Sequence, residues 1–134
     1  MLDASSWRAT QVLYFSAPTR ALNETELQDL ADHVQGRNES LGLTGFLYAS
    51  PSRFCQLLEG PEEDVLDLME KIIRDNRHDK VQVMIEASTL SPVFHRFHVR
   101  LRHGIADQAS EQMRLHRLSL KMVQHICHNR FMPK

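Results

Sequence analysis

The sequence predicts an α+β fold in which one sheet of five strands carries two helices on one face. Short segments rich in β-branched and aromatic residues alternate apolar and polar positions, as strands do, and two longer segments repeat apolar residues at helical spacing. Their order along the chain is β-α-β-β-α-β-β. This is a ferredoxin-like order with one added strand, in which both helices can cover the same sheet face.

The first strand and the first helix follow a polar N-terminal lead at residues 1–10. Residues 11–16 (QVLYFS) are rich in β-formers and predict the first strand. Asn23 stands three residues before Glu26, which is the spacing of a capping box at a helix N-terminus. We expect this helix to end near residues 36–38. Its apolar stripe consists of Leu27, Leu30, Ala31 and Val34.

A hairpin and a second helix come next. Residues 43–49 and 53–59 are β-like runs separated by a Ser-Pro-Ser turn, and they should pair antiparallel. Proline suits the first position of a helix because its missing N–H would have no partner there. The second helix should therefore begin at Pro61 and run to about Asp75. Its predicted buried residues are Val65, Leu68, Met69 and Ile72.

Two further strands complete the sheet. Val81, Val83 and Ile85 alternate with polar neighbours and predict the fourth strand. The same alternation at residues 97–101 predicts the fifth.

We place one domain at residues 11–102 and a C-terminal segment at residues 103–134. Apolar residues at helical spacing across 106–131 predict further helices in that segment. Such helices would cover the sheet face that the first two helices leave open, or would mediate dimerisation.

Composition places the chain among ordinary folded proteins, with 42% hydrophobic and 25% charged residues. The formal net charge of -1 provides no basic surface for phosphates, which disfavours a nucleic-acid partner. No window reaches the roughly 20 apolar residues that a membrane span needs. With two cysteines and no apolar signal segment after Met1, we expect a cytoplasmic protein with reduced thiols.

Three polar side chains occupy positions that the patterns predict to be buried. Tyr14 lies in the middle of the first strand, Gln56 interrupts an apolar row in the third, and Asn38 extends the apolar stripe of the first helix. Burying such groups without a partner costs about 1–3 kcal/mol each. They are either separately satisfied structural residues or a set that binds the polar edge of a planar ligand.

Other reactive residues have structural explanations. His125, His128 and His116 are close in sequence, but no cysteine has ligand-like spacing to another, and no metal site is predicted. Strand alternation points Cys55 to the sheet face opposite Gln56, where core packing explains it.

The stretch from Asn38 to Gly60, NESLGLTGFLYASPSRFCQLLEG, resembles the central signature of BLUF domains, which sense blue light with a flavin. The shared features are an asparagine, L-T-G, a hairpin, and a glutamine followed by L-E-G. LYFS at residues 13–16 resembles the family's first strand, and RDNRH at residues 74–78 resembles the end of its second helix. The resemblance covers residues 11–101, roughly two thirds of the chain.

The resemblance implies a non-covalently bound oxidised flavin, FAD in most members, with FMN as the alternative. Tyr14 and Gln56 match the two residues at the edge of the flavin ring, and Asn38 would hold its pyrimidine-like edge. Leu30 and Ile72 would sandwich the faces of the ring. The residues implied to meet the ribityl and phosphate portion are Lys71, Asp75 and His78.

The resemblance also implies a mechanism without enzymatic turnover. In the family, blue light drives an electron and a proton from the tyrosine to the flavin and back, and the glutamine is left rearranged. A carboxamide suits this role because its two ends have opposite hydrogen-bonding character. Gln56 is the implied switch.

The sequence departs from the family pattern at three positions. Many members carry a tryptophan and a methionine in the fifth strand, where this chain has Phe97 and Val99. The fifth strand and the C-terminal segment are the expected output elements, so we expect these two departures to affect the lifetime of the lit state and the route of the signal. Arg37 stands where asparagine or histidine is more common, and it would either contact the flavin tail or be solvated.

The expected output is a light-dependent contact with an unidentified protein effector, because the remaining chain leaves no room for an effector domain. Self-association as a homo-oligomer is also expected. One alternative is an interaction module that has kept the fold but lost flavin or photoactivity. Another is an acylphosphatase-like enzyme, but Thr19 and Arg20 lie in a loop without the glycines that its phosphate site would need.

Overall fold

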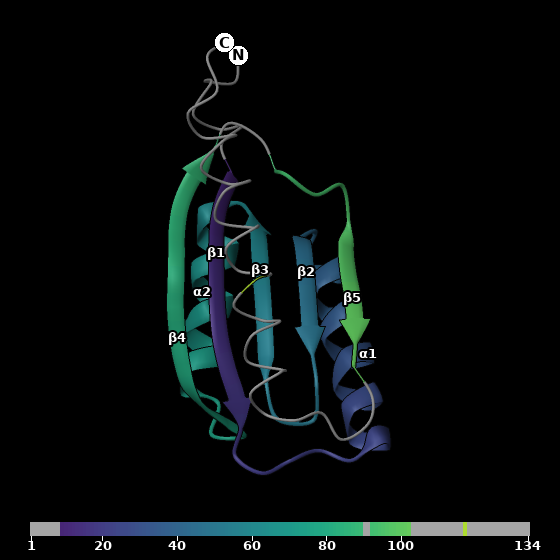
Figure 1. Ribbon diagram of the computed structural model, residues 1–134. Helices are drawn as coiled ribbons and strands as arrows, with labels where there is room; N and C mark the ends of the chain where they lie inside the picture. Colours follow the sequence, from purple (N-terminus) through teal and green to yellow (C-terminus); the bar gives the residue numbers. More distant parts are fainter. Residues whose placement is uncertain (1–8, 90–91, 103–116, 118–134) are drawn as a thin grey trace, which may run out of the picture.

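The computed structural model describes residues 9–89, 92–102 and 117. The elements follow the predicted order β-α-β-β-α-β-β (Figure 1). The helices expected at 106–131 and most of the N-terminal lead lie outside the described residues. The elements are β1 (Ala9–Pro18), α1 (Glu24–Ser40), β2 (Thr44–Ala49), β3 (Phe54–Gly60), α2 (Glu62–Arg74), β4 (His78–Thr89) and β5 (Phe97–Leu101).

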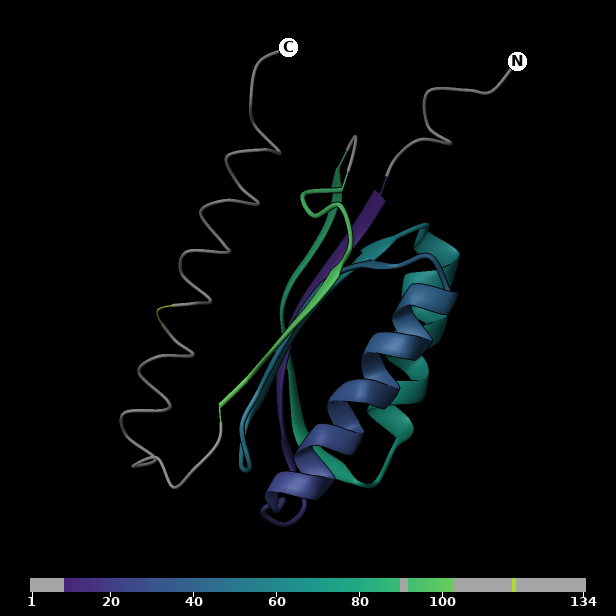
Figure 2. The same ribbon diagram turned by 90° about the vertical axis from the view of Figure 1, so that its right-hand side faces the viewer.

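The five strands form one sheet in the order β4-β1-β3-β2-β5. β1 pairs antiparallel with β3 and β4, and β2 pairs antiparallel with β3 and parallel with β5. Figure 2 shows α1 and α2 on the same face of this sheet, as predicted. On that face α2 packs against β1 and β3, and α1 packs against β2 and β5.

The sheet separates two apolar clusters. The cluster between sheet and helices includes Val12 and Leu58 from the central strands and Leu27 and Leu68 from the helices. The cluster on the opposite face consists of buried Leu13, Phe46, Cys55, Leu57 and Ala87. The prediction that Cys55 packs on the face away from Gln56 is confirmed, and burial raises the pKa of its thiol to about 12.

The first helix begins as predicted and ends later. The Asn23 side chain accepts a hydrogen bond from the Glu26 N–H at 2.8 Å, and the Glu26 carboxylate accepts one from the Asn23 N–H at 3.2 Å, which completes the capping box. The helix continues past Gly36 to Ser40, because the buried Asn38 anchors one more turn against the sheet. Local propensity alone favoured an earlier end.

The second helix corrects one expectation. Pro61 is the N-cap and not the first helical residue, because its ψ of 139° is extended. Its carbonyl accepts the first helical hydrogen bond, from the Val65 N–H at 3.0 Å. The buried residues of α2 are the four that were predicted.

The alternation predicted for β4 is interrupted by a bulge. Leu13 pairs with Ile85 and Tyr14 with Val83, so Met84 is the extra residue. Val81 consequently packs against the helix-side cluster while Ile85 packs against the opposite one. Periodicity alone placed them on one face, and it could not reveal the bulge because pairing with β1 creates it.

Gly45, in the L-T-G motif, permits the close approach of β2 to β3. Its φ is 129°, and a Cβ at this position would lie 2.0 Å from the Leu57 carbonyl oxygen. Any other residue would force the strands apart. The motif glycine is therefore explained by backbone packing.

A buried carboxylate connects the sheet to the segment that precedes β5. Glu59 is fully buried. Its Oε2 accepts hydrogen bonds from Gln11 Nε2 and the Val93 N–H, both at 2.6 Å. Its Oε1 accepts from the Thr44 hydroxyl and the Phe94 N–H, both at 2.9 Å. Four donors replace the water that burial removes, and they hold β1, β2, β3 and the approach to β5 together.

Replacing Glu59 with Gln should lower the free energy of unfolding by about 2–4 kcal/mol, because the amide nitrogen would face a donor and leave it unsatisfied. Urea denaturation would measure this loss. Glu63→Gln, at an exposed position in the first turn of α2, should change stability by less than about 1 kcal/mol. A Glu59→Gln protein as stable as the wild type would show that these bonds are energetically neutral.

Candidate functional site

Tyr14, Gln56 and Asn38 meet in the space between the sheet and the helices. The register of β1 and β3 sets Tyr14 directly opposite Gln56, and α1 brings Asn38 over them. Their exposed fractions are 3%, 2% and 0%. Gln56 Nε2 donates a hydrogen bond to the Tyr14 hydroxyl, and Asn38 Nδ2 donates to Gln56 Oε1 at 3.0 Å. The three groups that sequence patterns singled out are therefore partners of one another.

The two departures in β5 lie on the same sheet face. Leu47 pairs with Gln56 on one side and with Val99 on the other, so one strand separates Val99 from Gln56. Phe97 is buried in the helix-side cluster, and Val99 packs against it. Phe97 therefore lies in the core on the same sheet face as the site, and Val99 is partly buried on that face. Their part in output stays a prediction.

A cavity of about 470 Å³ opens beside the Tyr14–Gln56 pair. Tyr14 and Gln56 form part of its wall, with Leu30 from α1 and Ile72 from α2. Asp75 and His78 also line it. Six of the eight predicted site residues therefore surround one cavity.

The other two predicted residues lie elsewhere. Asn38 contacts Gln56 but does not line the cavity. Lys71 is exposed on α2 and is also absent from the lining. Its predicted contact with a ligand tail has no support in the position of its side chain.

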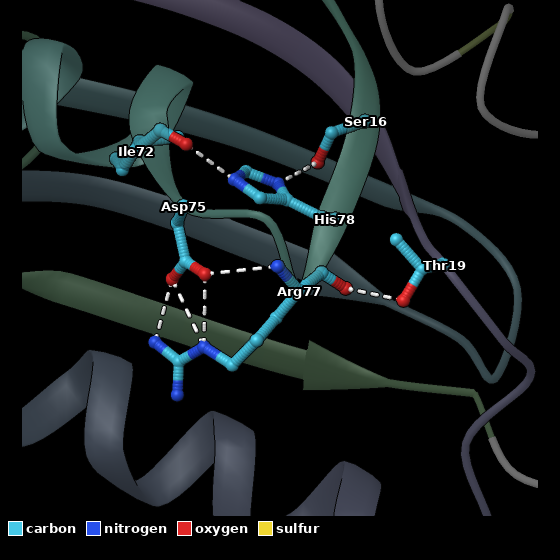
Figure 3. A network of polar contacts seen from close by, with 6 residues as sticks. All are labelled: Ser16, Thr19, Ile72, Asp75, Arg77 and His78. Carbon is cyan, nitrogen blue, oxygen red and sulfur yellow. Dashed lines mark hydrogen bonds and ion pairs between the residues drawn. The ribbon is translucent and has the colours of Figure 1, made fainter.

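A polar network occupies the end of α2 and the start of β4 (Figure 3). Arg77 Nη2 donates to Asp75 Oδ2 at 2.6 Å. His78 bridges Ser16 Oγ at 3.0 Å and the Ile72 carbonyl oxygen at 2.5 Å. Because a carbonyl only accepts, Nε2 is the nitrogen that carries a hydrogen. His78, at the start of β4, is thus held in place by contacts to β1 and α2.

Sequence reasoning missed Arg77 and Glu59 as structurally important residues. Arg77 lies inside the RDNRH motif, but only the folded chain shows that it pairs with Asp75 and lines the cavity. Glu59 lies inside the L-E-G motif. An acidic residue in a strand of otherwise buried residues was the available signal for it.

Burial and charge shift the pKa values of two cavity residues in opposite directions. Burial raises the pKa of the Tyr14 phenol far above its usual value, and this outweighs the lowering by the Gln56 hydrogen bond and by the charge of Arg37. Tyr14 therefore keeps its proton at neutral pH. Hydrogen bonding from Arg77 lowers the pKa of Asp75 to about 2, so this carboxylate is ionised.

The described residues contain neither a candidate metal site nor a candidate membrane span. No three His, Cys, Asp or Glu side chains in that part of the chain converge on a possible metal position. The histidines at 116, 125 and 128 lie outside it. Neither described helix is long and apolar enough to cross a membrane.

Comparison with known proteins gives a family match over most of the chain. The model of the BLUF family, described as sensors of blue light using FAD, matches residues 9–100. The photoactivated adenylate cyclase subunit alpha of Euglena gracilis is 32% identical over 95 residues, which cover 69% of this chain and 9% of that protein. The chain thus spans about a tenth of the length of such relatives.

Solved structures share the fold. The structure of Klebsiella pneumoniae BlrP1 with FMN and cyclic diGMP is 26% identical with a TM-score of 0.56, covering 69% of this chain and 25% of that one. BlsA in its ground state is 30% identical with a TM-score of 0.56, and the match covers 71% of this chain and 66% of BlsA. The dark-state structure of the BLUF protein BlrB has a TM-score of 0.61 at 22% identity. The match covers 72% of this chain and 75% of BlrB, and at this identity it supports the ferredoxin-like fold alone.

Replacing Arg77 with Met should raise the pKa of Asp75 from about 2 toward its ordinary value of 3.8. Because the folded-state pKa lies below the unfolded value, the pair stabilises the wild type above about pH 4, and this contribution is lost as the pH falls toward 2. Carboxyl NMR titration would measure the change. Arg20→Met, which breaks the pair with Glu26, should leave the pKa of Asp75 unchanged. An unchanged value in Arg77→Met would assign the shift to another group.

Proposed function

The chain belongs to the BLUF family of blue-light sensors that use FAD, and from this premise we propose that Tyr14 and Gln56 form its light-driven switch. Like its family, the domain is a flavin-binding photosensor and not an enzyme. The observation that carries the proposal is the hydrogen bond between Gln56 and Tyr14 at the wall of the 470 Å³ cavity.

The cavity suits a flat aromatic ring with one polar edge. Leu30 and Ile72 offer apolar surfaces from the two helices, and the sheet side offers the phenol and the carboxamide. We propose that the flavin ring lies between the two apolar side chains with its polar edge toward Tyr14 and Gln56. Asp75 and His78 would then lie near the ribityl and phosphate portion. FMN shares this portion, so it would fit the same contacts.

The protonated phenol of Tyr14 is the group from which the proposed cycle would start. A phenol that holds its proton this firmly does not ionise at neutral pH. A flavin held in the cavity would supply the absorption of blue light and an acceptor for an electron and a proton. In the proposed cycle Tyr14 loses both and then regains both, so no net reaction remains.

The side chain of Gln56 would remain rearranged after that cycle. In the structure its nitrogen faces Tyr14 and its oxygen faces Asn38, and we propose this as the dark arrangement. Rotation would exchange the two ends, and tautomerisation would instead move a proton from the nitrogen to the oxygen. Either change would alter the hydrogen bonds offered to the cavity. Each exchanged hydrogen bond is worth about 0.5–1.5 kcal/mol. The output element must therefore have two conformations of nearly equal free energy.

We propose that the signal leaves through β5 and the segment at residues 103–134. Val99 lies one strand from Gln56, and Phe97 packs in the same cluster. Relatives carry the domain within much longer proteins, such as an adenylate cyclase subunit, which supports a protein effector for this chain. A cytoplasmic location is consistent with Cys55, a free and buried thiol.

A module that has lost its flavin is not favoured, because the family match spans the site and Tyr14 and Gln56 are both present. The discriminating measurement is an absorption spectrum of protein purified in the dark and repeated after a blue flash. A flavin band that shifts to the red and returns in the dark is expected. A colourless protein that FAD does not reconstitute would contradict the flavin site.

Replacing Tyr14 with Phe or Gln56 with Leu should leave the flavin bound and abolish the light-induced shift, because each change removes one group of the switch. Difference absorption spectroscopy of the flavin-loaded proteins would measure it. Tyr48→Phe is the matched control, since Tyr48 packs against the cluster on the opposite sheet face. Normal photoconversion in Tyr14→Phe or Gln56→Leu would remove that residue from the mechanism.

We also propose that the protein forms a homo-oligomer, since the apolar residues in the sequence at 106–131 require burial. Sedimentation velocity of the full chain, in the dark and under blue light, should show concentration-dependent association. A monomer at every concentration in both states would refute this.

A further inference from the structure

Arg37 lies in the last turn of α1, next in sequence to Asn38. Its side chain is half-buried and lines the cavity. Its Nε donates a hydrogen bond to Asn38 Oδ1 at 3.1 Å. Together with the bonds described above, this makes a continuous chain of donors and acceptors from Arg37 through Asn38 and Gln56 to Tyr14.

The direction of donation along this hydrogen-bond series needs a cause, because most of its members can exchange their donating and accepting ends. A phenol hydroxyl both donates and accepts, so Tyr14 accepts either end of Gln56 equally well. The amides of Gln56 and Asn38 each have one donating and one accepting end. Reversing both amides together would preserve the bonds among Tyr14, Gln56 and Asn38. Those three residues alone therefore leave two arrangements close in energy.

Arg37 removes this ambiguity, because a guanidinium only donates and stays charged at every physiological pH. Its Nε–H requires an oxygen, so Asn38 must turn Oδ1 toward Arg37 and Nδ2 toward Gln56. Gln56 must then present Oε1 to Asn38, which leaves Nε2 for Tyr14. Each step follows from the one before.

On the basis of the proposed Gln56 switch, we propose that Arg37 is a positioning residue that fixes the dark orientation of the Gln56 amide through Asn38 and thereby limits the lifetime of the switched state. The hydrogen-bonded route from Arg37 to Gln56 runs through Asn38.

The lifetime follows from a conflict between donors. When Gln56 exchanges its two ends, its NH₂ group faces the NH₂ group of Asn38. In the imidic acid tautomer, the Gln56 oxygen carries a hydrogen and is a weaker acceptor for that NH₂ group. Asn38 could relieve the conflict by turning its own amide, but its Oδ1 would then leave Arg37. The bond to Arg37 is charge-assisted, and such bonds are roughly twice as strong as neutral ones. Arg37 therefore makes the switched state less stable and its return faster.

The test compares two substitutions of similar size in the full flavin-loaded chain. Lysine at position 37 still only donates, whereas glutamine can offer either end of an amide. Arg37→Gln should lengthen the dark recovery of the light-induced shift about tenfold, as expected when a hydrogen bond to a charged group is lost. Arg37→Lys should stay within about threefold of the wild type, since the ammonium still requires an acceptor. Flash absorption spectroscopy would measure both.

A second measurement in the dark separates direction from charge. The side-chain amide resonance of Gln56, identified by its loss in Gln56→Leu, should shift in the ¹H–¹⁵N spectrum of Arg37→Gln and remain near its wild-type position in Arg37→Lys. Ser40→Ala removes a hydroxyl that caps the Arg37 carbonyl without reaching Asn38. It controls for disturbance of the helix end and should alter neither readout.

The outcomes distinguish this proposal from the switch itself. A wild-type shift with equal recovery in Arg37→Gln and Arg37→Lys would overturn the role of Arg37 and leave the switch intact. Slow recovery in Arg37→Gln with an unmoved Gln56 resonance would also overturn it, because loss of charge alone would then be the cause. A flavin-loaded wild type without any shift would refute the switch, while the dark spectra would still decide whether Arg37 orients Gln56.

Discussion

The antiparallel register of β1 and β3 is the constraint on which the site depends. It places Tyr14 opposite Gln56, with both side chains on the face that the helices cover. Because side chains alternate between faces along a strand, a slip of one residue would turn Gln56 toward the opposite cluster. The hydrogen bonds of the buried Glu59 to Gln11 and Thr44 oppose such a slip, because they hold β3 in one register against β1 and β2. A second buried polar group thus helps to position the Tyr14–Gln56 pair.

The same strand carries a second buried polar anchor. Gln56 faces the helices, whereas Glu59, three residues further along, accepts hydrogen bonds from the segment that leads into β5. β2 lies between β3 and β5 and links the two through Leu47 and Val99. A rearrangement at Gln56 therefore has a short route, through packed and hydrogen-bonded neighbours, to the strand proposed for output.

Much of the site could be predicted from residue types and spacing. Tyr14, Gln56 and Asn38 are polar residues in apolar patterns, and burial made their need for partners foreseeable. The motif resemblance then pointed to a flavin, and the family match confirms it. That Arg77, and not Lys71, lines the cavity could not be foreseen, because which cation of a polar segment turns toward a cavity depends on the path of the chain around it.

The sequence by itself determined the order of the elements, the capping box at Asn23, the hairpin and the burial of the polar triad. These features arise from local propensity and periodicity, which neighbouring residues express without distant help. Tertiary structure alone decided the bulge at Met84, the continuation of α1 past Gly36, and the hydrogen-bonded order from Arg37 to Tyr14. Each of these depends on contacts between residues far apart in sequence. Such contacts form only when the sheet and the helices pack together.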